Sequence, residues 1–140
     1  MCLYIDKTKT NKAKKNKTGK VVRWKVVKRS GCLGKLYSVC FPGFPWNPGW
    51  NKAKNRQDVN LSSMEREYGI VDVGIHVFST EKRASCFKNV SHDPYEFIVK
   101  VICYNKDLVA VGKKNDEVYM KVFLPKDEHN DAVKSKGIER

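Results

Sequence analysis

A histidine and a carboxylate in one β-like segment are the residues best suited to chemistry. Residues 70–78 (IVDVGIHVF) alternate, which predicts a strand with His76 and Asp72 on its outward face. A histidine near a carboxylate can act as a general base, and the thiol of Cys40 or Cys86 can then serve as the nucleophile. The alternative is that His76 is a solvated or capping side chain without a catalytic role.

The five cysteines favour free thiols over disulfides or a metal site. Their number is odd and they are scattered along the chain, which is typical of proteins from a reducing, intracellular compartment. A structural zinc site usually needs two close pairs of ligands, and the sequence has neither a C-x-x-C nor an H-x-x-x-H pair. We therefore expect neither a metal nor another cofactor. Cys103 alternates with Val99 and Val101, which predicts a small core residue.

The positive charge is concentrated near the start of the chain. The formal net charge is +13, and eleven of the 28 Lys and Arg residues lie within residues 7–29, a stretch without an acidic residue. Residues 7–20 (KTKTNKAKKNKTGK) have no large apolar side chain, so this part of a basic arm over residues 1–20 is predicted to be disordered on its own. Its expected partner is anionic: nucleic acid, an acidic protein or an acidic lipid surface. A solubilising tail is the alternative. The candidate binding residues are Lys12, Lys14, Lys15, Lys17 and Lys20.

Residues 41–51 (FPGFPWNPGWN) contain three prolines, two glycines and four aromatic side chains. Proline and glycine interrupt helices and strands, so this composition predicts an irregular loop. Proline also restricts the backbone, which makes Phe44, Trp46 and Trp50 candidates for a preformed surface that docks a protein or stacks on bases. The alternative is a loop that covers the core as a lid.

The elements that must position these residues are mostly strands. Helices are predicted at residues 61–68 and from Ser79 or Thr80 to about Val90. The segment 126–140 is expected to form no more than a helical turn that adds little to the core. The fold class is therefore α+β, with a mostly antiparallel sheet of five or six strands, two short helices and the basic arm. Strands are predicted at residues 21–28, 35–41, 70–78, 95–104 (central in the sheet), 108–111 and 117–124.

The length of 140 residues suits one domain. We place it at residues 21–125, including the loop at 41–51, between the arm and a charged tail at 126–140. No stretch approaches the roughly 20 apolar residues of a membrane helix, and the first residues lack an apolar leader segment. We therefore expect no membrane span and a location inside the cell or in a virion.

Several short motifs resemble small uncharacterised proteins of bacteriophages and large DNA viruses, over about residues 20–124. The resemblance implies a viral protein, and it favours a non-enzymatic component of a large assembly. The motifs are GKLYSV at 34–39, WNPGWN at 46–51, GIHVFSTEKRA at 74–84 and IVKV at 98–101.

The order of LYS, then G-x-H with a following helical alanine, then a late strand also resembles ADP-ribosyltransferase-like folds. That resemblance implies a nicotinamide cleft lined by Tyr37, His76 and Ala84. Glu117, at the start of a predicted strand, is the candidate for the late catalytic glutamate of such folds.

Three functions follow from these observations. The first is a minor capsid or virion protein that clamps neighbouring subunits through the basic arm and the aromatic loop. The second is a nucleic-acid-binding protein whose lysines neutralise phosphates. The third is an ADP-ribosyltransferase-like or thiol enzyme, with His76 and Glu117 as its candidate catalytic residues.

Overall fold

The computed structural model describes residues 3–15, 19–30, 35–38, 45–52, 70–71, 74–91 and 94–134. In this part of the chain the fold is α+β, with mostly antiparallel strands and three helices, which confirms the predicted class. The helices are α1 (Lys7–Lys14), α3 (Glu81–Ser91) and α4 (Lys126–Lys134), with a short 3-10 helix η2 (Asn105–Asp107). The strands are β1 (Leu3–Tyr4), β2 (Lys20–Ser30), β3 (Lys35–Ser38), β4 (Pro45–Trp46), β5 (Gly49–Lys52), β6 (Ile70–Val71), β7 (Ile75–Val77), β8 (Glu96–Tyr104), β9 (Leu108–Val111), β10 (Glu117–Tyr119) and β11 (Lys121–Leu124).

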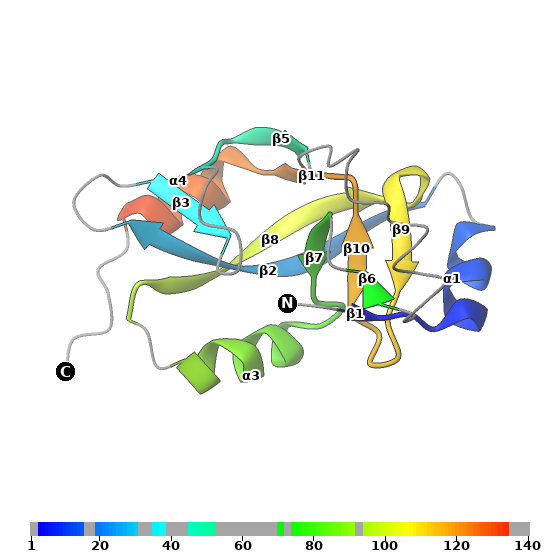
Figure 1. Cartoon of the computed structure of the whole chain (residues 1–140). Coiled ribbons are helices and arrows are strands. Elements are labelled where there is room, and N and C mark those ends of the chain that lie inside the picture. Colours follow the sequence, from blue (N-terminus) through cyan, green and yellow to red (C-terminus); the bar gives the residue numbers. More distant parts are fainter. Residues whose placement is uncertain are drawn as a thin grey trace.

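The larger sheet has six strands in the order β4-β3-β2-β8-β11-β5, all paired antiparallel (Figure 1). Its centre is the long pair of β2 and β8, which runs in register from Lys20 opposite Tyr104 to Lys28 opposite Glu96. A slip by one residue would move every side chain to the other face, so the buried face fixes this register. The central position predicted for residues 95–104 is confirmed.

The smaller sheet has three strands in the order β7-β10-β9, and β1 pairs with β6 beside it. Reciprocal backbone hydrogen bonds between Trp24 and Phe78, with N···O distances of 3.1 and 2.8 Å, join the end of β7 to β2. The chain itself makes the second connection, because β10 leads directly into β11 of the larger sheet. These connections tie the two sheets to each other.

The continuous strand predicted at residues 117–124 is wrong. The chain runs through the smaller sheet as β10, turns at Met120, which is 41% exposed, and enters the larger sheet as β11. Three successive residues of β10 are buried, because other elements cover both of its faces. Alternation on a single face therefore does not describe this segment. The three buried residues are Glu117, Val118 and Tyr119.

The predicted strand over residues 70–78 is also interrupted. Gly74 has a φ of +88°, and a Cβ at this position would lie 2.6 Å from Cγ1 of Val118, so the position requires glycine. Beyond this residue, His76 is only 3% exposed. The predicted outward position of His76 is thus wrong, because its neighbours Val77 and Phe78 are buried as well and β7 is covered on both faces.

The predicted disorder of the basic arm is wrong for residues 7–14, which form α1. The side chain of Asp6 caps the helix by accepting from the backbone N–H of Lys9 at 3.0 Å. The Thr10 side chain is buried, and its hydroxyl lies 2.9 Å from the backbone N and 3.2 Å from the backbone O of Val111 in β9. Polar anchoring of this kind replaces the large apolar side chains that the segment lacks.

Helix α3 was predicted, and helix α4 is longer than the predicted helical turn. The helix predicted after Ser79 or Thr80 is α3, and the hydroxyl of Thr80 accepts from the backbone N–H of Arg83 at 3.2 Å. The prediction that residues 126–140 add little to the core is wrong for α4, because Ala132 is buried in the main core. The other predicted helix, at residues 61–68, lies outside the described residues.

The aromatic segment is more regular than its composition predicts. It contributes β4 and β5, the two edge strands of the larger sheet, so the prediction of an irregular loop is wrong here. The Asn51 side chain stabilises the turn between them, donating to the backbone O of Asn47 at 2.8 Å and of Gly49 at 3.1 Å. Residues 41–44, which include Phe44, lie outside the described residues. Across the part of the chain that is described, no helix is long and apolar enough to cross a membrane.

Candidate functional site

His76, the candidate general base, is sealed in the protein interior. Neither of its ring nitrogens has a hydrogen-bond partner among the described residues. Burial, helped by the positive charge of the nearby Lys25, lowers the pKa of His76 to about 3. Such an imidazole is neutral near pH 7 and holds a proton too weakly for general-base catalysis at that pH.

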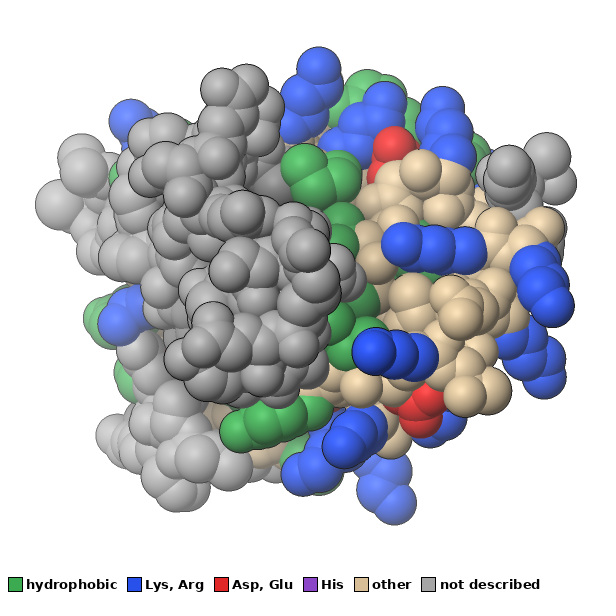
Figure 2. Space-filling view, turned by 45° about the vertical axis from the view of Figure 1, so that its right-hand side comes forward, with side chains coloured by type: hydrophobic (Ala, Val, Ile, Leu, Met, Phe, Trp, Pro, Cys, Tyr) green, Lys and Arg blue, Asp and Glu red, His purple; other side chains and the backbone are tan. Residues whose placement is uncertain are grey.

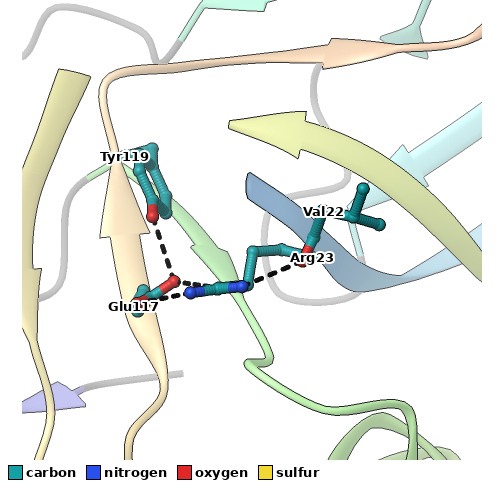
Figure 3. Close-up of polar contacts among 4 residues, drawn as sticks. All are labelled: Val22, Arg23, Glu117 and Tyr119. Atoms are coloured by element: carbon teal, nitrogen blue, oxygen red, sulfur yellow. Dashed lines mark hydrogen bonds and ion pairs between the residues drawn. The ribbon is translucent and has the colours of Figure 1, made fainter. Parts of the chain in front are cut away.

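Glu117, the candidate catalytic glutamate, is engaged by two partners (Figure 3). It forms an ion pair with the guanidinium of Arg23 from β2, with one contact between Nε and Oε1 and a second of 3.3 Å between Nη2 and Oε2. The Tyr119 hydroxyl donates to Oε1 of the same carboxylate at 3.0 Å. Arg23 also donates from Nη1 to the backbone O of Val22 at 3.0 Å. These contacts join β10 to β2 across the space between the two sheets.

The two titratable side chains beside this ion pair, Tyr119 and Cys103, have raised pKa values and therefore stay protonated near pH 7. Burial raises the pKa of the Tyr119 hydroxyl, and the charge of Glu117 raises it further. Burial likewise raises the pKa of the Cys103 thiol to about 12. A thiol in this state is not a nucleophile near pH 7, and the prediction that Cys103 is a core residue is confirmed.

The candidate catalytic residues are not brought to one site. His76 pairs with Val118, the neighbour of Glu117, and successive side chains on a strand point to opposite faces, so His76 and Glu117 face away from each other. Ala84 packs in a separate cluster with Val26 and Phe78, while Tyr37 lies on β3 opposite Lys28. Cys86 is exposed on α3. Asp72 and Cys40 lie outside the described residues, and those that are described contain no cluster suited to a metal ion.

The lysines of the N-terminal segment form a defined surface. Thr10 and Ala13 turn toward β9, and the lysines predicted to bind a partner turn outward. Figure 2 looks toward the end of the molecule that carries α1, and blue Lys and Arg side chains are spread across that face with little red among them. Lys17 lies outside the described residues. The exposed lysines are Lys7, Lys12, Lys14, Lys15 and Lys20.

The turn between β9 and β10 extends this surface. Lys113 and Lys114 are exposed there, and Nζ of Lys9 donates to the backbone O of Lys113 at 3.2 Å. Asp116, at the end of the same turn, forms an ion pair of 2.8 Å with Arg83 of α3. We call α1 together with Lys15, Lys20, Lys113 and Lys114 the basic surface.

Aromatic side chains gather on the outer face of the larger sheet. The Trp50 ring centroid lies 5.6 Å from that of Tyr104 and 5.4 Å from that of Phe123. Nζ of Lys121 lies 4.8 Å from the Trp50 ring and Nζ of Lys106 lies 5.8 Å from the Tyr104 ring, as in cation–π contacts. We call Trp50, Tyr104 and Phe123 the ring cluster.

The two tryptophans of the aromatic segment differ in burial. Trp46 is 6% exposed and packs in the main core, as the lid alternative predicts, whereas Trp50 is 45% exposed. Sequence reasoning missed Tyr104 and Phe123. The available signal was their outward position in two predicted strands, together with the alternation of apolar and basic residues along that face.

Comparisons with known protein families, with curated proteins and with solved structures found no match for this chain.

Proposed function

We propose that the protein binds nucleic acid through the basic surface. The observation that carries the proposal is the attachment of α1 to β9 by Thr10, which holds exposed lysines on a fixed helix. Fixed cations lose less conformational freedom on binding than those of a disordered tail. Lysines that meet phosphates release the counterions condensed on nucleic acid, and this release drives association.

The other anionic partners fit this surface less well. A helix that binds a lipid surface inserts an apolar face, commonly with Trp, Phe or Leu. The only apolar side chain of α1 is Ala13, and it packs inward against the core. The charge also favours a ligand of repeating negative charge, since the lysines continue from α1 to the turn between β9 and β10.

The test is the salt dependence of binding. Replacing Lys12, Lys14 and Lys15 together by Gln should reduce the slope of log K against log salt by about 2 to 3, because each phosphate contact contributes about 0.7 to 0.9. Fluorescence anisotropy with a labelled oligonucleotide measures the slope.

The matched control replaces three exposed lysines of β3 and α4 by Gln. These two elements lie at the opposite end of the molecule from α1 (Figure 1), so we expect the slope to stay unchanged. Equal slopes for the two triple variants would contradict the proposal. The control residues are Lys35, Lys126 and Lys134.

The expected role as a minor capsid or virion protein stays a prediction, as does an enzymatic role. Fractionation of intact particles bears on the first, because a structural component stays with the particle after treatment with nuclease and salt. Binding to nucleic acid is compatible with a location inside the cell and with a location in a virion.

A further inference from the structure

We propose that the ring cluster is a stacking site for unpaired bases, so that the nucleic acid bound is single-stranded. The inference rests on the proposed function and adds the class of ligand. Trp50, Tyr104 and Phe123 come from three adjacent strands, β5, β8 and β11. Regular strands hold these rings in place before any ligand arrives, which lowers the entropic cost of binding.

The ring cluster lies on the open part of the outer face of the larger sheet. Helix α3 covers another part of this face, where Ala84 and Phe78 pack against Val26. Beyond α3, Val22 is 47% exposed and the indole of Trp50 remains accessible. Exposed aromatic and apolar side chains on one sheet face indicate a binding surface, since they cost free energy unless a partner covers them.

The register shows which side chains share this face. Val22 pairs with Ile102, Ile102 with Phe123, and Phe123 with Trp50, so one row of apolar side chains crosses four strands. A second row holds the basic residues: Lys20 pairs with Tyr104, and Lys121 pairs with Lys52. None of these residues is acidic.

Basic side chains beside aromatic rings favour a ligand that carries both aromatic groups and negative charges. Nζ of Lys121 and Nζ of Lys106 lie over the Trp50 and Tyr104 rings. A base that stacks on such a ring displaces the ammonium group, which can then meet a phosphate of the same strand. A duplex hides the faces of its bases, whereas a single strand can turn them outward. An apolar protein partner would use the rings and leave these lysines without a role.

The ring cluster is continuous with the basic surface. Lys106 belongs to η2, which contacts α1, and the backbone N–H of Asn105 in η2 donates to the backbone O of Gly19 at 2.8 Å. Lys20 is thus held beside η2 at the start of β2. A single strand whose bases stack on Trp50 and Tyr104 has a path of positive charge from Lys121 past Lys106 to α1.

The experiment compares four labelled probes of about twelve nucleotides with the full chain. They are single-stranded DNA, the same sequence as RNA, the DNA duplex and an abasic single strand that keeps the phosphates. We expect either single strand to bind more tightly than the abasic strand by about tenfold or more. The difference between DNA and RNA identifies the natural ligand.

Three variants of Trp50 separate the contribution of the rings from that of the charge. Trp50→Ala removes the stacking side chain and should weaken binding of the single strand by about 5- to 100-fold. Trp50→Leu keeps an apolar side chain on the sheet and should weaken it to a similar degree, while Trp50→Phe should restore most of the affinity. Abasic and duplex binding, and the salt slope, should stay as in the unchanged protein. Urea unfolding of each variant verifies that the fold is kept.

The outcomes separate this inference from the proposed function. If Trp50→Ala and Trp50→Leu bind the single strand as tightly as the unchanged protein, or if the abasic strand binds equally well, the stacking site is overturned. The basic surface would still stand in that case if the triple lysine variant lowers the slope. If no probe binds at low salt, both proposals are overturned.

Discussion

Glu117 lies where a catalytic carboxylate was expected, and its contacts favour a structural role. Arg23 and Tyr119 both bind this carboxylate, which is buried between the two sheets. Taking one partner away from a buried ion pair leaves the other without compensation for its lost hydration. The contribution of Glu117 should therefore appear in stability.

We expect Glu117→Ala to lower the free energy of unfolding by about 3 kcal/mol, because it leaves the Arg23 guanidinium without its carboxylate. Urea denaturation measures the change. The matched control is Arg83→Ala, which breaks the pair with Asp116, where the Arg83 side chain is 40% exposed. Exposed pairs contribute about 0 to 1 kcal/mol, so the control should lose little. Equal losses for the two variants would show that Glu117 is not a structural anchor.

The sequence predicts which residues lie on the same face of a strand better than it predicts what covers that face. The alternation in residues 70–78 groups His76 with one face of a strand, but it does not reveal whether another element covers that face. Burial changed the interpretation of His76 from an accessible base to a neutral interior group. The same limit applies to Trp46 and Trp50, whose separation into core and surface depends on the pairing of β4 with β3 and of β5 with β11.

Among the elements, α1 depends strongly on one buried polar side chain. An isolated helix of this length is marginal in water, and its sequence offers only Ala13 as an apolar side chain to the core. The Thr10 hydroxyl adds a buried attachment through its hydrogen bonds to Val111 of β9, and Lys9 adds an exposed one to the backbone O of Lys113. The basic surface therefore relies on the attachment made by Thr10.

Thr10→Val should detach or fray α1. The change keeps the shape of the side chain and leaves the buried backbone N–H of Val111 without its acceptor, at a cost of about 1 to 3 kcal/mol. Hydrogen exchange should show lost protection for the amides of residues 10–14, while the β2–β8 pair keeps its protection. Thr8→Val, on the exposed side of α1, is the control. Unchanged protection in Thr10→Val would mean that other contacts hold the helix.

The predictable elements are those with strong local patterns. β2, β8 and α3 follow from alternation or from a capping residue, and the structure confirms them. α1 and α4 are mostly polar helices that each pack through only a few side chains, so their apolar periodicity is too weak to detect. These are Thr10 and Ala13 in α1, and Ala132 and Val133 in α4. The turn at Met120 escaped prediction because it depends on a change of sheet.

At the scale of the whole molecule, pairings between distant segments decide the architecture. β2 pairs with β8, and β5 pairs with β11, so strands far apart in sequence become neighbours. No local pattern specifies this order. It nevertheless creates the candidate site, because it brings Trp50 beside Phe123 and Tyr104.

The whole fold should also respond to pH through His76. In the folded state burial lowers the pKa of His76 to about 3, while in the unfolded chain it stays near its ordinary value of 6.5. Below pH 6.5 the unfolded state therefore binds one more proton than the folded state. The stabilising effect of neutral His76 is complete above pH 6.5 and is lost as the pH falls toward 3.

We expect the free energy of unfolding to decrease between pH 6.5 and 5 by up to about 1.4 kcal/mol per pH unit through His76 alone. This window lies above the ordinary range of carboxylates, so other titrations interfere least there. His76→Leu cannot take up a proton, and its stability should stay flatter over the same window in urea denaturation. His129→Gln is the control, since Nε2 of His129 has a partner in the backbone O of Trp46 at 3.2 Å. If the His76→Leu curve runs parallel to that of the unchanged protein, His76 accepts a proton in the folded state, and its burial does not govern acid stability.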